Sequence, residues 1–229
     1  FEGMTSQADA DNMAPVSAGT MANDPTGLTI VKRADSLNAR VGLALAGAEF
    51  LVEPATEGDR FVDGAASKRL VTGADGIAAP AGATEQERAA NALEGQLIVG
   101  MSYRVTETKA PDGYAISSDY DSVVVTVQAD GSVLLVEPAV QVPGWTVSGG
   151  AAPVLTVSDK PTELQLRKVD GDGNLLAGAV FGVRPAEGGT FADNDNSTDE
   201  MTFSPTGEGV VGKAAFIVGQ EYIVREVSA

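Results

Sequence analysis

The sequence predicts an all-β protein of two tandem β-sandwich domains, of which the second is incomplete. Short stretches of alternating or β-branched apolar residues recur along the chain and are separated by turn residues. Glycine occurs 27 times and proline 11 times, which suits a chain with many tight turns. A set of short motifs occurs twice in the same order, as expected for two similar domains.

The two copies of this repeat share a lysine near their start and a glutamate near their end. These residues are Lys32 and Glu107 in the first copy, and Lys168 and Glu226 in the second. The repeated segments are residues 28–32, 47–50 and 98–107, matched by residues 164–168, 178–181 and 217–226. Charged side chains are costly to bury among apolar strand residues, so each of the four needs a partner or a chemical task.

The composition excludes several classes of partner and of site. With a net charge of −17, the 229-residue chain lacks the basic surface that nucleic acids and anionic membranes require, so we expect neither as a partner. The acidic character suits solubility at an exposed, extracellular location. The absence of cysteine and histidine excludes disulfides, zinc sites of the Cys/His type, Ser-His-Asp triads and Cys-His pairs. No stretch of about 18 apolar residues exists that could insert into a membrane.

The chain divides into an N-terminal arm and two domains. Residues 1–26 are polar and lack periodicity, which is typical of a linker or a loosely attached arm. The first domain covers residues 27–161 and the second covers residues 162–229, with almost no linker between them. The second is about half as long as the first. We expect it to be truncated before its last strand, in a segment cut from a longer precursor.

The first domain is predicted to consist of strands with one helical insertion. Its strands are expected at residues 29–31, 48–52, 97–108, 122–128, 132–137 and 154–158. Residues 110–114 and 129–131 are predicted turns, because they combine Pro or Asp with Gly. Residues 53–96 are predicted to be an insertion at a sheet edge, with a short helix in which Thr84 is the N-cap and Glu87 completes a capping box.

The second domain is predicted to begin with a turn and to continue as strands around an acidic loop. The turn lies at residues 170–174 and the acidic loop at residues 186–200. The strands are expected at residues 179–184, 201–203, 214–218 and 221–227.

Both copies resemble the CnaB-type (SpaA-like, prealbumin-like) repeat domains of Gram-positive surface adhesins and pilins. The resemblance rests on an L-x-[IL]-x-K strand ending at Lys32, a G-A-x-F strand, and a Y-x-[LV]-x-E box ending at Glu107. In the first copy the box continues through residues 107–114, and residues 154–161 resemble the family's last strand, which ends in Asp or Asn before a proline. The resemblance covers about residues 27–229 and implies two Greek-key β-sandwiches.

In that family the strand lysine forms an amide with the Asp or Asn of the last strand, and the box glutamate catalyses the reaction. The resemblance therefore implies that Lys32 is the nucleophile, Asp159 the electrophile and Glu107 the proton shuttle. Burial suits this chemistry, because a buried amine can lose its proton and a buried carboxylic acid can stay neutral and open to attack. The reaction occurs once, so the chain is not expected to be an enzyme, and no cofactor is implied.

Two alternatives remain open at the level of the sequence. Lys32, Glu107 and Asp159 could form a buried salt-bridge cluster without any covalent bond. In the second domain, Lys168 and Glu226 are expected to lack their acid partner, because the matching Asp or Asn would lie beyond residue 229. Lys168 is then expected to pair with Glu226 or to lie partly in solvent.

Other motifs carry less information. Asp170, Asp172 and Asn174 have the spacing that begins a calcium loop, but Phe181 stands where the bidentate glutamate is needed, so we expect a turn and no metal site. Trp145, the only tryptophan, is expected to pack on the sandwich, with ligand binding as the alternative.

The resemblance implies a structural stalk or shaft segment of a cell-surface adhesin or pilus protein, located at the surface or cell wall of a Gram-positive bacterium. The expected partners are a host extracellular ligand or other subunits of a surface assembly. The alternative is a ligand-binding adhesin module that recognises a host protein or carbohydrate through residues 53–96 and Trp145.

Overall fold

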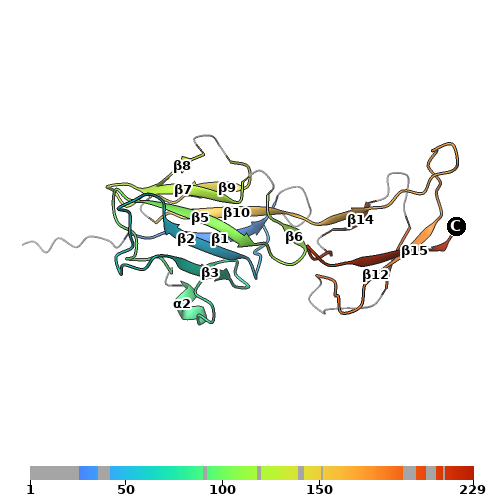
Figure 1. The fold of residues 1–229 in the computed structure, drawn as a ribbon, viewed down its shortest axis with the longest axis horizontal. Coiled ribbons are helices and arrows are strands. Elements are labelled where there is room, and N and C mark those ends of the chain that lie inside the picture. Colours follow the sequence, from blue (N-terminus) through green and yellow to red (C-terminus); the bar gives the residue numbers. More distant parts are fainter. Residues whose placement is uncertain are drawn as a thin grey trace, which may run out of the picture.

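The structure is almost entirely β-stranded and has two lobes, with strands β1 to β10 in the first and β11 to β15 in the second (Figure 1). This computed structural model describes residues 26–35, 42–89, 92–117, 120–138, 142–150, 152–192, 200–204, 210–213 and 215–229. The predicted N-terminal arm lies outside these ranges, apart from residue 26. None of the described helices is long and apolar enough to cross a membrane. The all-β prediction is confirmed.

A six-stranded antiparallel sheet forms one layer of the first lobe. Its strand order is β4-β3-β2-β5-β7-β8. The strands are β2 (Glu49–Pro54), β3 (Lys68–Thr72), β4 (Ala78–Ala79), β5 (Ser102–Lys109), β7 (Ser122–Val127) and β8 (Val133–Glu137). The β-branched run of β7 and the predicted hairpin into β8 both form, and Gly131 at the turn has a φ of 83° that glycine readily adopts.

The second layer brings the first and last strands of the lobe side by side. β1 (Thr29–Ala34) pairs in parallel with β10 (Val154–Pro161), and in this register Lys32 aligns with Val157 and Ala34 with Asp159. On its other side β10 pairs antiparallel with β9 (Trp145–Ser148), and its end pairs with β6 (Tyr114–Ala115). β10 is three residues longer than the predicted strand because β6 extends its pairing.

The core of the first lobe lies between these two layers. Tyr103 and Val105 on β5 face Leu155 and Val157 on β10, and all four are fully buried or nearly so. Trp145 is buried as well, with 3% of its surface exposed, so the prediction that it packs on the sandwich is confirmed. Burying an aliphatic or aromatic side chain of this kind contributes about 1.5–3 kcal/mol, which makes the core the main source of stability.

The segment 53–96 is only partly an insertion. Its helix, α2 (Glu85–Ala89), forms at the edge of the six-stranded sheet, next to β4. The predicted capping box is confirmed, because the Thr84 amide donates to Glu87 Oε2 at 2.7 Å and the Glu87 amide donates to Thr84 Oγ1 at 3.3 Å. The sequence prediction missed β3 and β4, which lie in the same segment and extend the sheet.

The second lobe contains two smaller sheets. One has the order β13-β12-β15 and the other pairs β11 with β14. The strands are β11 (Glu163–Gln165), β12 (Val180–Pro185), β13 (Met201–Phe203), β14 (Val210–Lys213) and β15 (Tyr222–Ser228). The prediction of a strand at residues 214–218 is wrong. The preceding strand, β14, ends at Lys213, and a turn at residues 217–220 leads into β15.

A tyrosine holds the same position in both lobes. The Tyr103 hydroxyl accepts from the Ile98 amide at 3.0 Å and donates to the Arg60 carbonyl at 2.7 Å. The Tyr222 hydroxyl accepts from the Ile217 amide and donates to the Thr190 carbonyl, both at 2.9 Å. The repeated motif in the sequence therefore produces a repeated local structure.

Candidate functional site

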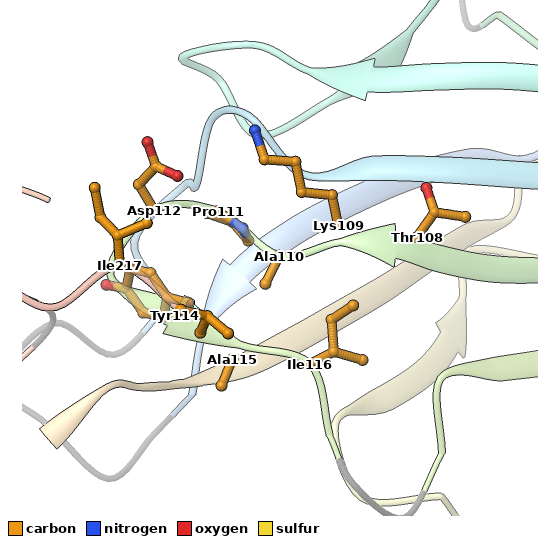
Figure 2. Close-up of a pocket in the computed structure, with 10 residues that line it drawn as sticks. Thr108, Lys109, Ala110, Pro111, Asp112, Tyr114, Ala115, Ile116 and Ile217 are labelled. Carbon is orange, nitrogen blue, oxygen red and sulfur yellow. The ribbon is translucent and has the colours of Figure 1, made fainter. Parts of the chain in front are cut away.

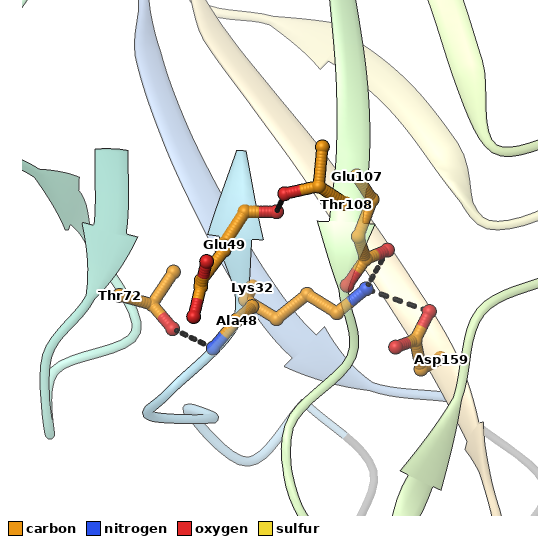
Figure 3. A network of polar contacts seen from close by, with 7 residues as sticks. All are labelled: Lys32, Ala48, Glu49, Thr72, Glu107, Thr108 and Asp159. Carbon is orange, nitrogen blue, oxygen red and sulfur yellow. Dashed lines mark hydrogen bonds and ion pairs between the residues drawn. The ribbon is translucent and has the colours of Figure 1, made fainter. Parts of the chain in front are cut away.

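Lys32, Glu107 and Asp159 meet inside the first lobe, although any two of them are between 52 and 127 positions apart in the sequence. Lys32 lies on β1, Asp159 on the neighbouring β10 and Glu107 on β5 of the facing sheet. The Lys32 Nζ lies 2.6 Å from Glu107 Oε2 and 2.6 Å from Asp159 Oδ1 (Figure 3). The amine therefore stands between the two carboxyl groups.

Strand periodicity explains why the three side chains point to one place. Successive residues of a strand face opposite sides of the sheet, so a charge two positions after an apolar core residue also points into the core. Each of the three strands carries its charged residue on an inward-facing row in this way, with the rows Leu28, Ile30 and Lys32; Tyr103, Val105 and Glu107; and Leu155, Val157 and Asp159. The charged residues lie at the same end of the sandwich because β1 and β10 are parallel.

The site is closed to solvent. The side chains of Lys32, Glu107 and Asp159 are 0%, 1% and 2% exposed, and the Lys32 Nζ lies 5.9 Å from the centre of the Phe50 ring. Two oxygens, Glu107 Oε1 and Asp159 Oδ2, are buried without a hydrogen-bond partner among the described residues. Buried charges cost several kcal/mol each when they are not fully paired, so burial disfavours the state in which both carboxyl groups are ionised.

Burial changes the protonation of both acids. It raises the pKa of Glu107 to about 7; the nearby Lys32 charge opposes this effect and the Asp159 charge adds to it. Burial also raises the pKa of Asp159 above its usual value, against the opposing effect of Lys32. A proton is therefore retained on the carboxyl pair at a pH where exposed carboxyl groups have lost theirs.

This arrangement can support condensation of an amine with a carboxylic acid. The amine is in contact with the carboxyl group, bulk water is excluded, and a second carboxyl group can move protons between them. The same three side chains also form a compact ion-pair cluster when no bond is present.

The corresponding pair in the second lobe is in a different environment. The Lys168 Nζ donates to Glu226 Oε1 at 2.8 Å and to Oε2 at 2.6 Å, while the side chains are 29% and 33% exposed. Among the described residues β11 pairs only with β14, so no strand lies beside it as β10 lies beside β1. The repeated lysine and glutamate thus meet in both lobes, and among the residues that the structure describes a buried acid lies beside the first pair alone.

Among the other sequence motifs, the turn at residues 170–174 forms as predicted. The Asp170 carboxylate accepts from the amides of Asp172 and Asn174 at 2.9 Å, which makes it part of a turn. No group of three or more potential metal ligands occurs in the described part of the chain. Most of the acidic run at residues 193–200 lies outside the described residues, and the buried Trp145 is not available to a ligand.

One repeated motif was missed in the sequence. Glu57 to Phe61 and Glu187 to Phe191 both read E-G-x-x-F. Phe61 stacks on Tyr103 at a centroid distance of 5.0 Å, and Phe191 stacks on Tyr222 at 5.5 Å. The carbonyl before each phenylalanine accepts the hydrogen bond of that tyrosine. Alignment of the two copies through residues 53–61 would have revealed this pairing.

Comparison with known proteins agrees with the sequence motifs. Residues 37–138 match the model of a family described as SpaA, a prealbumin-like fold domain. No match was found among curated proteins.

Similar solved structures come from pilins and pilus adhesins. A C-terminal fragment of the pilus adhesin SpaC from Lactobacillus rhamnosus GG is 17% identical with a TM-score of 0.40, covering 90% of this chain and 76% of the fragment. A streptococcal ancillary pilin is 16% identical with a TM-score of 0.37, covering 91% of this chain and 55% of that one. The shaft pilin SpaA from Lactobacillus rhamnosus GG is 13% identical with a TM-score of 0.34, covering 90% and 88%.

Proposed function

We propose that this chain, which contains a SpaA-type prealbumin-like domain, is a stalk or shaft segment of a bacterial surface adhesin or pilus protein. We further propose that an amide between Lys32 and Asp159, formed by the protein itself, stabilises its first lobe. The observation that carries the proposal is the 2.6 Å contact of the Lys32 amine with both carboxyl groups in a closed, apolar site.

The proposed reaction balances without any added reagent. The neutral Lys32 Nζ attacks Cγ of the protonated Asp159, so that one C–N bond forms and one C–O bond breaks. One amine proton and the acid's hydroxyl group leave together as a single water molecule. Glu107 takes the proton from nitrogen and delivers it to the departing oxygen, a role that a carboxyl group with a pKa of about 7 can perform in both directions.

The position of the bond suits a protein that must resist pulling. A pull on the two ends of the first lobe acts on β1 and β10, and the bond would join these two strands directly. The residues between Lys32 and Asp159 would then carry no tension. The bond would also close a loop of about 127 residues, which by the chain-entropy estimate for cross-links stabilises the fold on the order of 5 kcal/mol.

The proposed location is the surface or cell wall of a Gram-positive bacterium, with other subunits of a surface assembly or a host ligand as partners. A stalk segment is favoured over a ligand-binding module because the only tryptophan, Trp145, is buried in the core.

Intact mass spectrometry of the folded protein tests the proposed bond. The protein should be lighter than its sequence mass by one water, and a Lys32→Ala variant should have its full sequence mass. Peptide mapping should then find residues 32 and 159 in one cross-linked fragment. A folded wild-type protein with its full sequence mass would show that the triad is an ion-pair cluster only.

A further inference from the structure

A single threonine connects the two lobes. β10 ends at Pro161 and β11 begins at Glu163, so Thr162 alone lies between them. Its amide donates to the Gly113 carbonyl of the first lobe at 2.8 Å. Its hydroxyl can donate to the Phe216 carbonyl of the second lobe at 2.6 Å or to the Gly113 carbonyl at 3.0 Å, and it accepts from the Phe216 amide at 3.2 Å. The side chain thus binds the backbone of the second lobe as donor and as acceptor.

The groups that Thr162 binds are anchored in the second lobe. The Phe216 ring is buried and packs edge-on against Tyr222 at a centroid distance of 5.0 Å. The next residue, Ile217, donates its amide to the Tyr222 hydroxyl. The backbone at Phe216 therefore cannot shift without disturbing the aromatic core of the lobe.

The same threonine is close to Asp159 along the chain, and through Gly113 it contacts the loop that follows the strand of Glu107. Asp159 precedes it by three residues on β10, and Glu107 is followed by the loop that leads to Gly113. The pairing of β10 with β1 stops at Asp159, and beyond that point β10 pairs with β6 at Lys160 and Pro161. The end of β10 is thus held on one side by β6 and at its tip by Thr162.

Part of the space between the lobes beside this connection is a cavity. A cavity of about 410 Å³ lies beside the joint, lined by residues 108–112 and 114–116 of the first lobe and by Ile217 and Val218 of the second (Figure 2). Val218 is 67% exposed. Since an open cavity supplies no van der Waals contacts across it, the hydrogen bonds of Thr162 take a large share in fixing the joint.

We propose that Thr162 is a positioning residue: by fastening the second lobe to the end of β10, it holds Asp159 within reach of Lys32 while the amide forms. The proposal rests on the proposed cross-linking function and assigns a role in it to the second lobe. Loss of the Thr162 hydroxyl frees the end of β10, so that Asp159 spends less time against the amine.

Two substitutions separate the hydroxyl from the shape of the side chain. Thr162→Val keeps the β-branched shape and the backbone bond to Gly113 but removes every hydrogen bond of the hydroxyl, whereas Thr162→Ser keeps the hydroxyl. Each full-length protein would be made by cell-free synthesis, and the fraction lighter by one water would be followed over time by intact mass. We expect T162V to cross-link about fivefold more slowly, which corresponds to one hydrogen bond of about 1 kcal/mol, and T162S to react at the wild-type rate.

Hydrogen exchange supplies a readout of the joint itself. The Phe216 amide should lose protection in T162V and keep it in T162S, while the Ile217 amide, bound to Tyr222 within the second lobe, reports whether that lobe is folded. Wild-type rates in T162V, or rates in T162S as slow as in T162V, would overturn the inference and leave the cross-link intact. A wild-type protein that never loses water would overturn both proposals.

Discussion

The lysine–glutamate pair that the repeat places in each lobe lies in different surroundings in the two lobes. Lys32 and Glu107 are almost fully buried beside Asp159, whereas Lys168 and Glu226 are about one third exposed. An exposed ion pair contributes little to stability and is screened by water and salt. In the first lobe, burial instead keeps a proton on the carboxyl groups, which is the condition for attack by the amine.

The first prediction concerns Glu107. We expect Glu107→Ala to keep the fold but to stop amide formation, because Glu107 is the only proton-transferring group that contacts the amine beside Asp159 among the described residues. The variant should have its full sequence mass. Its free energy of unfolding should be lower than that of the parent by on the order of 5 kcal/mol, because the cross-link is missing. Glu226→Ala is the matched control in the second lobe and should still lose one water. Loss of water in Glu107→Ala would show that the shuttle role is wrong.

The second prediction concerns pH and the variant Lys32→Met. Since the folded-state pKa of each buried acid lies above its unfolded value, the native state binds more protons than the unfolded state, and stability falls as pH rises through this window. Without the lysine charge, the free energy of unfolding should fall between pH 5 and pH 8. The slope is about 1.4 kcal/mol per pH unit for each carboxyl group that is protonated in the folded state and ionised in the unfolded state.

Urea unfolding at the two pH values measures this effect. Lys168→Met removes the exposed lysine of the second lobe and serves as the control, because it leaves the buried carboxyl groups paired with Lys32. Equal stability of Lys32→Met at pH 5 and pH 8 would mean that the two acids do not hold protons in the folded state.

At the scale of elements, a tight turn supports the strand that carries Lys32. The turn at residues 73–77 lies against β1, where the Lys32 amide donates to the Gly76 carbonyl at 2.7 Å and Val31 forms a bridge with Ile77. The Arg88 side chain from α2 donates to the carbonyls of Val71 and Ile77 on the flanks of this turn. The segment 53–96 therefore contributes to the position of β1 and not only to the sheet edge.

The third prediction tests this turn. Gly76 has a φ of 77°, and a Cβ at this position would lie 2.6 Å from the Lys32 carbonyl oxygen. A left-handed conformation costs an alanine roughly 1–2 kcal/mol. We expect Gly76→Ala to lower the free energy of unfolding by more than this, because the clash adds to the backbone strain. Gly82→Ala is the control, since Gly82 has a φ of 78° with no atom within 4 Å of the added Cβ. Thermal unfolding of both variants measures the difference, and equal melting temperatures would contradict the prediction.

At the scale of the whole molecule, the two lobes have cores of different size. The first core joins buried side chains from both layers of the sandwich, while the second rests on Val183, Phe191, Ala215 and Phe216 with partly buried neighbours. Apolar residues of β15, among them Ile223 and Val224, are about 40% exposed. Since stability follows the apolar area removed from water, the second lobe should be the weaker of the two.

The fourth prediction follows from this difference. Backbone amides of residues 164–229 should exchange hydrogen faster than those of residues 97–159, because the second lobe can open without breaking the first core or the proposed cross-link. A peptide spanning residues 163–169, which includes β11, should therefore show low protection from exchange. Equal protection of the two lobes would mean that the second lobe is stabilised by contacts outside the described residues.

The sequence by itself determined the all-β class, the repeat and the identity of the triad. Alternation within each strand places Lys32, Glu107 and Asp159 on the inward faces. The repeat singled out Lys32 and Glu107, and the resemblance of residues 154–161 to the last strand of CnaB-type domains pointed to Asp159. Sequence reasoning failed where local signals are short or ambiguous. β4 has only two residues, and residues 215–218 form no strand, because the Ile217 amide donates to the Tyr222 hydroxyl instead of to a neighbouring strand.

Only the tertiary structure decided what the charged residues can do. Lys32 and Lys168 occupy equivalent positions in the sequence, but β10 covers the first and no described strand covers the second. Burial depends on which strands lie side by side, and that arrangement depends on contacts between residues far apart in the chain. The burial that raises the pKa of Glu107 to about 7 and the contacts of Thr162 with both lobes result from this packing and have no local signature in the sequence.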